Sequence, residues 1–211
     1  MKIHFAEIIP IPLIDNRSNK IWPLSIEFEC GKNYLITSPS GKGKTTLIHF
    51  IYGLRSDYIG KITLDKKNIK KINKIDWAEY RQEKFSIVYQ DLRLFQDLTA
   101  MENLLLKVTL TNYKIRKDIF TMAEMFGVQD LLNNKCSTLS YGQQQRIAII
   151  RSLLQPFKFL LLDEPFSHLD KDNMKLGCDL ISAECARQNA SVIVTSLNEE
   201  YFFNYEKRIN L

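Results

Sequence analysis

Residues 38–46, Ser-Pro-Ser-Gly-Lys-Gly-Lys-Thr-Thr, combine the residue types that bind phosphate. Gly41 and Gly43 allow the backbone to curl, so that several N–H groups point inward at phosphate oxygens. Lys44 supplies a compact cation to the terminal phosphates, and the Thr45 hydroxyl can bind Mg²⁺. This spacing predicts a phosphate-binding loop.

The surroundings of the loop support this prediction. An apolar strand is expected over 33–38 and a helix over 45–54, whose positive end adds to the field at the loop. Ser38 stands where the usual motif begins with glycine, so the loop entry should differ slightly. A glycine-serine turn that caps a helix without a ligand is the alternative. The predicted nucleotide contacts are Ser38, Pro39, Ser40, Gly41, Lys42, Gly43, Lys44, Thr45 and Thr46.

A second chemical pattern is the apolar run 159–162, which ends in Asp163 and Glu164. A buried strand would deliver Asp163 to the carboxyl edge of the sheet, where it can hold Mg²⁺ through water. Glu164 can polarise the attacking water as a general base. Helix capping at the strand end is the alternative, but the phosphate loop favours a nucleotide site.

These residues must be positioned by an α/β fold, because short apolar strands alternate with helices along the chain. Between 98 and 132 the apolar spacing becomes helical, which predicts an inserted helical lobe with a stop at Gly127. The helical spacing is carried by Ile119, Met122, Ala123 and Phe126. The expected strands are 25–29, 33–38, 61–64, 85–89, 158–162 and 191–195.

Composition fits one compact globular unit of 211 residues, with 45% hydrophobic and 25% charged residues. No apolar run approaches the roughly 20 residues of a membrane-spanning helix, and His4 and Glu7 interrupt the N-terminal stretch, which excludes a secretory signal. Four scattered cysteines indicate a reducing, cytosolic setting and argue against a zinc site.

The net charge of +5 owes much to five lysines within 66–74. A solvated face is favoured over a nucleic-acid patch, because no aromatic residues interleave with these lysines. An anionic membrane surface is the other neighbour considered. We therefore expect no nucleic-acid partner.

Residues 139–143, Leu-Ser-Tyr-Gly-Gln, resemble the LSGGQ signature of ATP-binding-cassette (ABC) proteins. Gln90, which closes the expected strand 85–89, resembles the glutamine of the family's Q-loop, and residues 167–170 resemble its D-loop. Together with the phosphate loop and the acidic strand end, these motifs stand in the family's order and cover most of the chain. The combination is far more specific than any single motif.

The resemblance implies a single ABC ATP-binding domain spanning 1–211. Its fold would be a P-loop NTPase (RecA-like) core of about 1–90 and 156–211, with an antiparallel β element and an inserted α-helical subdomain of about 91–155. The chain would then be the ATP-binding and hydrolysing subunit of an ABC transporter or mechanotransmission complex. It would lie at the cytoplasmic face of the inner or plasma membrane, as a peripheral subunit.

The resemblance also implies ATP and Mg²⁺ as cofactors, with transmembrane permease subunits and a second ATP-binding subunit as partners. Two copies would dimerise head to tail, so that one copy's signature closes on the other copy's ATP. Implied catalytic residues are Glu164, Gln90 and Ser196; implied metal ligands are Thr45, Gln90 and Asp163; implied signature contacts are Ser140, Gly142 and Gln143.

Residues 98–104 and the triple glutamine 143–145 resemble the lipoprotein-releasing, macrolide-exporting and cell-division branch of the family. Members of that branch pair with permeases that have a large extracytoplasmic domain. The helical lobe would carry the groove for the permease's coupling helix. Phe95 and Leu98 would line that groove or belong to the lobe's own core.

Three positions depart from the family's pattern. Ser196 replaces the switch histidine that follows 191–195, which predicts slow hydrolysis with ATP binding kept; the alternative is a largely non-catalytic, ATP-gated scaffold. Tyr141 replaces a signature glycine, and its side chain either crowds the dimer interface or points outward. The stretch 8–14 lacks the aromatic residue on which adenine would stack, which predicts weak selectivity between adenine and guanine nucleotides.

Overall fold

A parallel sheet of five strands forms the centre of the molecule in the computed structural model, which describes residues 1–13, 22–197 and 199–211. Its order is β6-β7-β8-β3-β9, and every neighbouring pair is parallel. The strands are β3 (Tyr34–Thr37), β6 (Phe85–Val88), β7 (Phe159–Asp163), β8 (Ser191–Ser196) and β9 (Lys207–Asn210). The predicted α/β fold class is confirmed.

A second, antiparallel sheet has the order β2-β1-β4-β5 and supplies the predicted antiparallel element. Its strands are β1 (Lys2–Pro10), β2 (Leu24–Glu29), β4 (Tyr58–Leu64) and β5 (Lys67–Asn68). Strands β2 and β3 flank the expected turn at Gly31, whose φ is 91°, yet they belong to different sheets. The turn therefore connects two layers of the molecule.

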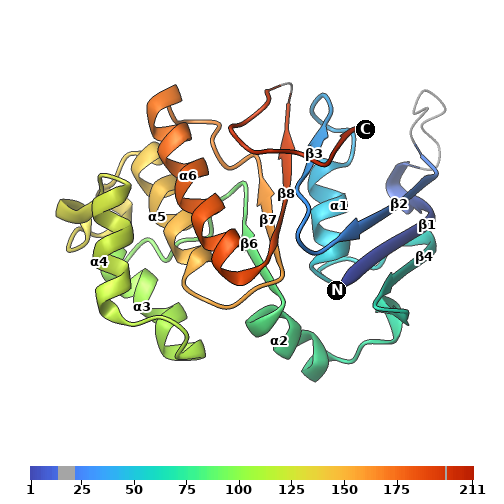
Figure 1. The fold of residues 1–211 in the computed structure, drawn as a ribbon, viewed down its shortest axis with the longest axis horizontal. Helices are drawn as coiled ribbons and strands as arrows, with labels where there is room; N and C mark the ends of the chain where they lie inside the picture. Colours follow the sequence, from blue (N-terminus) through green and yellow to red (C-terminus); the bar gives the residue numbers. More distant parts are fainter. Residues whose placement is uncertain (14–21, 198) are drawn as a thin grey trace.

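Within the described ranges, six α-helices cover the two sheets: α1 (Lys44–Ile51), α2 (Lys74–Glu83), α3 (Ala100–Thr111), α4 (Arg116–Met125), α5 (Tyr141–Leu153) and α6 (Lys171–Gln188). Helices α3, α4 and α5 gather with α6 on one side of the parallel sheet, whereas α1 and the antiparallel sheet lie on the other side (Figure 1). Gly127, with φ of 62°, follows α4 at the predicted stop. Among the described residues, no helix is long and apolar enough to span a bilayer.

Strand β7 divides the core into two halves. Leu160 and Leu162 pack with the helices of one side, whereas Phe159 and Leu161 pack with α1 and the antiparallel sheet. This alternation follows from the period of two in a strand. Because both faces are buried, the strand carries its polar group only at its carboxyl end, at Asp163.

The lysine-rich segment around β5 is exposed at all five lysines. The Lys67 Nζ pairs with Asp76 Oδ2 at 2.6 Å, and the Lys70 Nζ lies 4.0 Å from the centre of the Tyr58 ring. Both arrangements suit a solvated face, the interpretation that the sequence favours over a nucleic-acid patch.

Candidate functional site

The phosphate loop links β3 to α1 at the carboxyl edge of the parallel sheet. Gly41 has a φ of 78° and Gly43 a φ of 103°, both in the left-handed region where a side chain would strain the backbone. Gly43 also caps α1, whose first residue is Lys44. The structure thus gives the loop its predicted position, between a buried strand and the N-terminus of a helix.

Lys44 is the buried cation of this loop, with only 4% of its surface exposed. Its Nζ donates hydrogen bonds to the carbonyl oxygens of Ser38 at 2.6 Å and Pro39 at 3.2 Å. The same Nζ lies 3.3 Å from Glu164 Oε1. The ammonium group is therefore held at the mouth of the loop, where phosphate oxygens could exchange with its present partners.

A cavity of about 190 Å³ opens above this lysine. It brings together most of the predicted loop contacts with Gln90 and Glu164, which lie far apart in the sequence. Its lining is Pro10, Pro12, Ser40, Gly41, Gly43, Lys44, Thr45, Thr46, Gln90 and Glu164. Ser38 is fully buried beneath the loop, and its N–H donates to the Ser196 carbonyl oxygen at 3.3 Å. The two prolines bring an apolar wall that no sequence motif indicated.

The acidic strand end is fixed by Thr195, a residue that the motifs did not reveal. Thr195 Oγ1 donates to Asp163 Oδ1 at 2.8 Å and accepts the Glu164 N–H at 3.1 Å. The pairing of β7 with β8 places Thr195 directly opposite Asp163. Glu164 has a φ of 50°, so the backbone turns sharply there and sends the two carboxylates in different directions.

The predicted metal ligands also converge. Thr45, Gln90 and Asp163 line one cavity of about 440 Å³, which shares Thr45 and Gln90 with the cavity above the phosphate loop. Hydroxyl, amide and carboxylate oxygens are the donors that Mg²⁺ prefers. Asp163 is 2% exposed, which makes a hard cation the natural counter-charge for its carboxylate. The donor set therefore fits Mg²⁺.

The signature motif begins a helix on the same edge of the sheet. Ser140 caps α5: its Oγ accepts the Gln143 N–H at 3.3 Å, and Gln143 Oε1 accepts the Ser140 N–H at 2.9 Å. A methyl group on Gly142 would lie 2.9 Å from the His168 carbonyl oxygen, so this close approach requires glycine. None of these three signature residues lines the described part of the phosphate-loop cavity.

The Tyr141 side chain contacts the loop at Gln90 and the D-loop of the same chain. Its hydroxyl donates to the Gln90 carbonyl oxygen at 2.7 Å, and its ring centre lies 4.3 Å from that of His168. Tyr141 is 41% exposed. The sequence predicts that the Tyr141 side chain either crowds the dimer interface or points outward. Neither prediction includes this contact with the Q-loop.

Ser196 ends β8 and is 1% exposed. Its Oγ accepts the Glu199 N–H at 2.9 Å. Burial raises the pKa of Tyr201 to about 12, and the contact of that hydroxyl with Ser196 partly opposes this rise. Ser196 lines neither cavity in the described residues. Its hydroxyl is thus engaged by its own loop, and its catalytic role stays a prediction.

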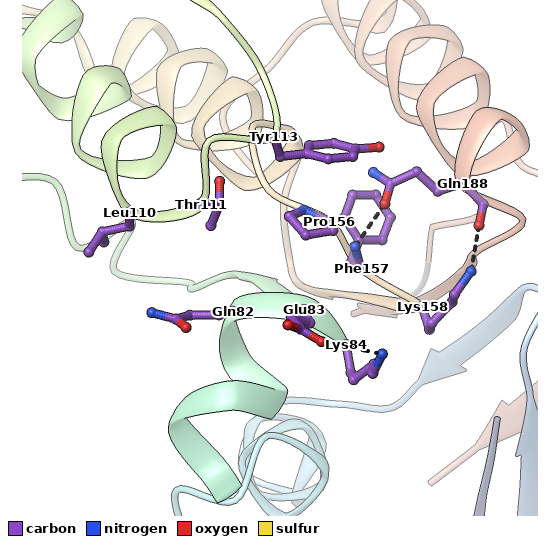
Figure 2. A pocket seen from close by; sticks show the side chains of 10 residues that line it. All are labelled: Gln82, Glu83, Lys84, Leu110, Thr111, Tyr113, Pro156, Phe157, Lys158 and Gln188. Carbon is purple, nitrogen blue, oxygen red and sulfur yellow. Dashed lines mark hydrogen bonds and ion pairs between the residues drawn. The ribbon is translucent and has the colours of Figure 1, made fainter. Parts of the chain in front are cut away.

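Another cavity, of about 460 Å³, lies between the ends of α2, α3 and α6 (Figure 2). Lys84 and Lys158, which line it, immediately precede strands β6 and β7. The cavity is therefore at the amino edge of the sheet, opposite the phosphate loop. Ligands of such sheets bind at the carboxyl edge, so this cavity is separate from the candidate nucleotide site.

A parallel sheet that delivers a phosphate loop and an acidic strand end to one edge defines an α/β P-loop fold. A model of the family described as "ABC transporter" matches residues 21–167. The chain belongs to the ABC transporter family, whose ATP-binding subunits are ATPases.

Curated relatives agree with this assignment. Lipoprotein-releasing system ATP-binding protein LolD 1 of Chlorobium chlorochromatii is 32% identical over 89% of this chain and 78% of its own length. Glucose import ATP-binding protein GlcV of Saccharolobus solfataricus is 31% identical over 89% of this chain and 54% of its own length.

Solved structures share the fold. The dimeric structure of MJ0796, a bacterial ABC transporter cassette, has a TM-score of 0.78 at 24% identity, over 92% of this chain and 87% of that chain. A putative ABC transporter ATP-binding protein from Pyrococcus furiosus has a TM-score of 0.77 at 20% identity. The match covers 99% of this chain and 98% of that chain. The expected fold, with its parallel sheet, antiparallel sheet and helical region, is confirmed.

Proposed function

We propose that this chain is the ATP-hydrolysing subunit that powers a membrane transporter or mechanotransmission complex. The observation that carries the proposal is the meeting of Lys44, Gln90 and Glu164 around one cavity at the phosphate loop. The glycine-rich backbone and Lys44 bind the phosphates of ATP. Glu164 acts as the general base on the attacking water, and Gln90 positions that water.

Mg²⁺, held by Thr45, Gln90 and Asp163, would neutralise charge on the phosphates of the bound nucleotide. Thr195 holds the Asp163 carboxylate in place through its 2.8 Å hydrogen bond. In this scheme phosphate oxygens replace the Glu164 carboxylate as the partner of Lys44 when ATP binds. The carboxylate is then free to contact the attacking water.

The proposal includes head-to-tail dimerisation of two copies. Ser140 and Gly142 lie at the start of a helix, a favourable place to hold a phosphate, yet they do not line the phosphate-loop cavity of their own chain. They would serve the ATP bound by the second copy. MJ0796 is described as dimeric, which supports this arrangement by analogy of fold.

We further propose that residues 91–155 act as the helical subdomain and receive the coupling helix of a permease, with the chain peripheral at the cytoplasmic face of the membrane. Phe95 is 58% exposed and so does not belong to the lobe's core, whereas Leu98 is half-buried. Leu106 and Leu110, 41% and 63% exposed, extend the apolar surface along α3. Several LolD proteins among the relatives favour a permease of the lipoprotein-releasing branch.

A largely non-catalytic, ATP-gated scaffold is the second candidate function. It is favoured by Ser196, whose hydroxyl is engaged by Glu199 and carries no charge to offer a phosphate. Glu164 and Gln90 weigh against it, because a protein that only binds ATP would need neither.

A steady-state ATPase assay separates the two functions. The purified protein, alone and with the membrane partner captured from detergent extracts, should release phosphate with Mg²⁺-ATP, and Glu164→Gln should not. Absence of hydrolysis in both preparations, with ATP binding intact, would favour the scaffold. Phe95→Asp should weaken capture of the permease, whereas the control Phe120→Asp, at an exposed position of α4, should not.

A further inference from the structure

We propose that Tyr141 is a positioning residue that fixes the Q-loop of its own chain from the start of the signature helix. The inference rests on the proposed function, because the Q-loop side chain that it positions is the one assigned to Mg²⁺ and water. It assigns the signature region a role within its own chain, in addition to the proposed contact with the second copy.

The first observation is the hydrogen bond from the Tyr141 hydroxyl to the Gln90 carbonyl oxygen, 2.7 Å long and spanning 51 residues of sequence. It fixes the peptide that follows Gln90, where the chain leaves β6. Tyr141 and Gln90 also line the same cavity as Thr45 and Asp163. A single phenol thus contacts the backbone of one predicted metal ligand and faces the space that holds the other two.

The second observation concerns the Q-loop itself, which does not hold its conformation by local preference. Leu92 and Arg93 have φ of 56° and 48°, in the left-handed region that residues with a side chain rarely adopt. Such a conformation persists only where surrounding contacts impose it. The loop has contacts of its own, such as the Leu92 N–H to the Tyr89 carbonyl oxygen at 3.0 Å, and we infer that contacts from residues outside the loop stabilise it further.

Helix α5 supplies these contacts from two points. The Arg151 guanidinium donates to the carbonyl oxygens of Leu92 at 2.6 Å and Arg93 at 2.7 Å. Tyr141 lies ten residues earlier on the same helix, about 15 Å away along its axis. The helix holds the loop at both ends, and Tyr141 is the contact nearest to the nucleotide site.

The third observation is the packing of the Tyr141 ring on His168 of the D-loop, with 4.3 Å between ring centres. His168 is itself held by hydrogen bonds of its N–H to Gln145 Oε1 at 3.2 Å and of its ring Nδ1 with Ser167 Oγ at 2.9 Å. The phenol therefore has a fixed support behind it. Signature helix, Q-loop and D-loop meet at this one side chain.

Amide hydrogen exchange of the nucleotide-free protein tests the contact without requiring hydrolysis. Tyr141→Phe keeps the ring and removes the hydroxyl, so exchange in the segment 89–95 should accelerate about two- to tenfold, the range that one hydrogen bond supports. Tyr141→Gly should accelerate it further. Tyr58→Phe is the control, because that buried hydroxyl has no hydrogen-bond partner among the described residues.

Kinetics separate positioning from a merely structural effect. Tyr141→Phe should lower kcat about three- to tenfold and change the KM for ATP less than about twofold, because the phosphate loop is untouched. Unchanged exchange at 89–95 in Tyr141→Phe would overturn the inference, as would protection that appears only at protein concentrations that allow dimerisation. A rise in KM with kcat unchanged would also overturn it. If the parent hydrolyses no ATP, the proposed function fails, and the exchange comparison still decides the role of Tyr141.

Discussion

The phosphate-loop region and the signature region lie on the same edge of the molecule but are built differently. In the first, Lys44 and Asp163 are almost fully buried, and each is paired within the chain. In the second, Ser140 is exposed, and among the residues that the structure describes its side chain is hydrogen-bonded only within its own capping box. One region encloses a cavity, whereas the other presents a helix start to the outside.

This difference fits the proposal that one chain holds two half-sites. A buried, internally neutralised cation keeps its geometry before the ligand arrives, and this preorganisation favours tight phosphate binding. An exposed helix start offers weak, screened interactions until a partner excludes water. We therefore expect substitutions in the phosphate-loop region to cause large losses of ATP binding or hydrolysis. Substitutions in the signature region should have effects of graded size.

Glu164→Gln should have the largest effect. It removes the proposed general base while keeping the shape of the side chain, so kcat should fall about 100-fold or more with ATP affinity retained. Phosphate release and nucleotide binding measured on the same preparation check this expectation. A variant that retains most of its turnover would mean that the acidic strand end does not supply the base.

Lys44→Ala should weaken ATP binding about 10- to 100-fold, because it removes the charge-assisted hydrogen bonds to the phosphates. Isothermal titration with a slowly hydrolysed ATP analogue measures the change. Lys61→Ala, an exposed lysine on the antiparallel sheet, is the matched control and should bind normally. Equal affinity in both variants would contradict the assignment of the phosphate loop.

Ser196→His should raise kcat about three- to tenfold, since a histidine would add reach and partial charge toward the γ-phosphate. Ser196→Ala serves as the control and should not raise the rate above that of the parent. Turnover is measured with the membrane partner present. A Ser196→His variant no faster than the parent would contradict the prediction that the missing histidine slows hydrolysis.

Discrimination between the adenine and guanine bases of the bound nucleotide should be the smallest effect. The cavity at the phosphate loop has Pro10 and Pro12 as its apolar wall, and a proline side chain carries no hydrogen-bonding group that would distinguish adenine from guanine. Competition binding should therefore show ATP and GTP within about threefold of each other. The predicted stretch 8–14 includes Ile14, which lies outside the described residues. A preference of 100-fold would show that other groups read the base.

Sequence alone predicts the local parts of the candidate site, and the structure places them at one edge of the parallel sheet. The phosphate loop, Asp163 and Glu164 depend on neighbours in the chain, and their order with Gln90 and residues 139–143 specifies the family. The strand β7 is recognisable because its apolar run is buried on both faces.

The remaining features depend on pairing between distant segments. Thr195 faces Asp163 only because β7 and β8 pair in one register, and no local pattern encodes that register. Strand β1 alternates buried and exposed residues, but Glu7 interrupts this alternation, so the sequence pattern does not predict the strand. Glu7 has a φ of 52° and lies at a bulge. The contact of Tyr141 with Gln90 joins residues 51 positions apart. Tertiary structure decides all three.

The central claim is that the phosphate loop completes its site with the signature of a second copy. Light scattering of Glu164→Gln, which should bind ATP without hydrolysing it, tests this most directly. We predict a monomer without nucleotide, a dimer with Mg²⁺-ATP, and loss of that dimer when Ser140→Arg is added, with ATP binding retained. A protein that stays monomeric at saturating ATP, or whose dimer tolerates Ser140→Arg, would contradict the account.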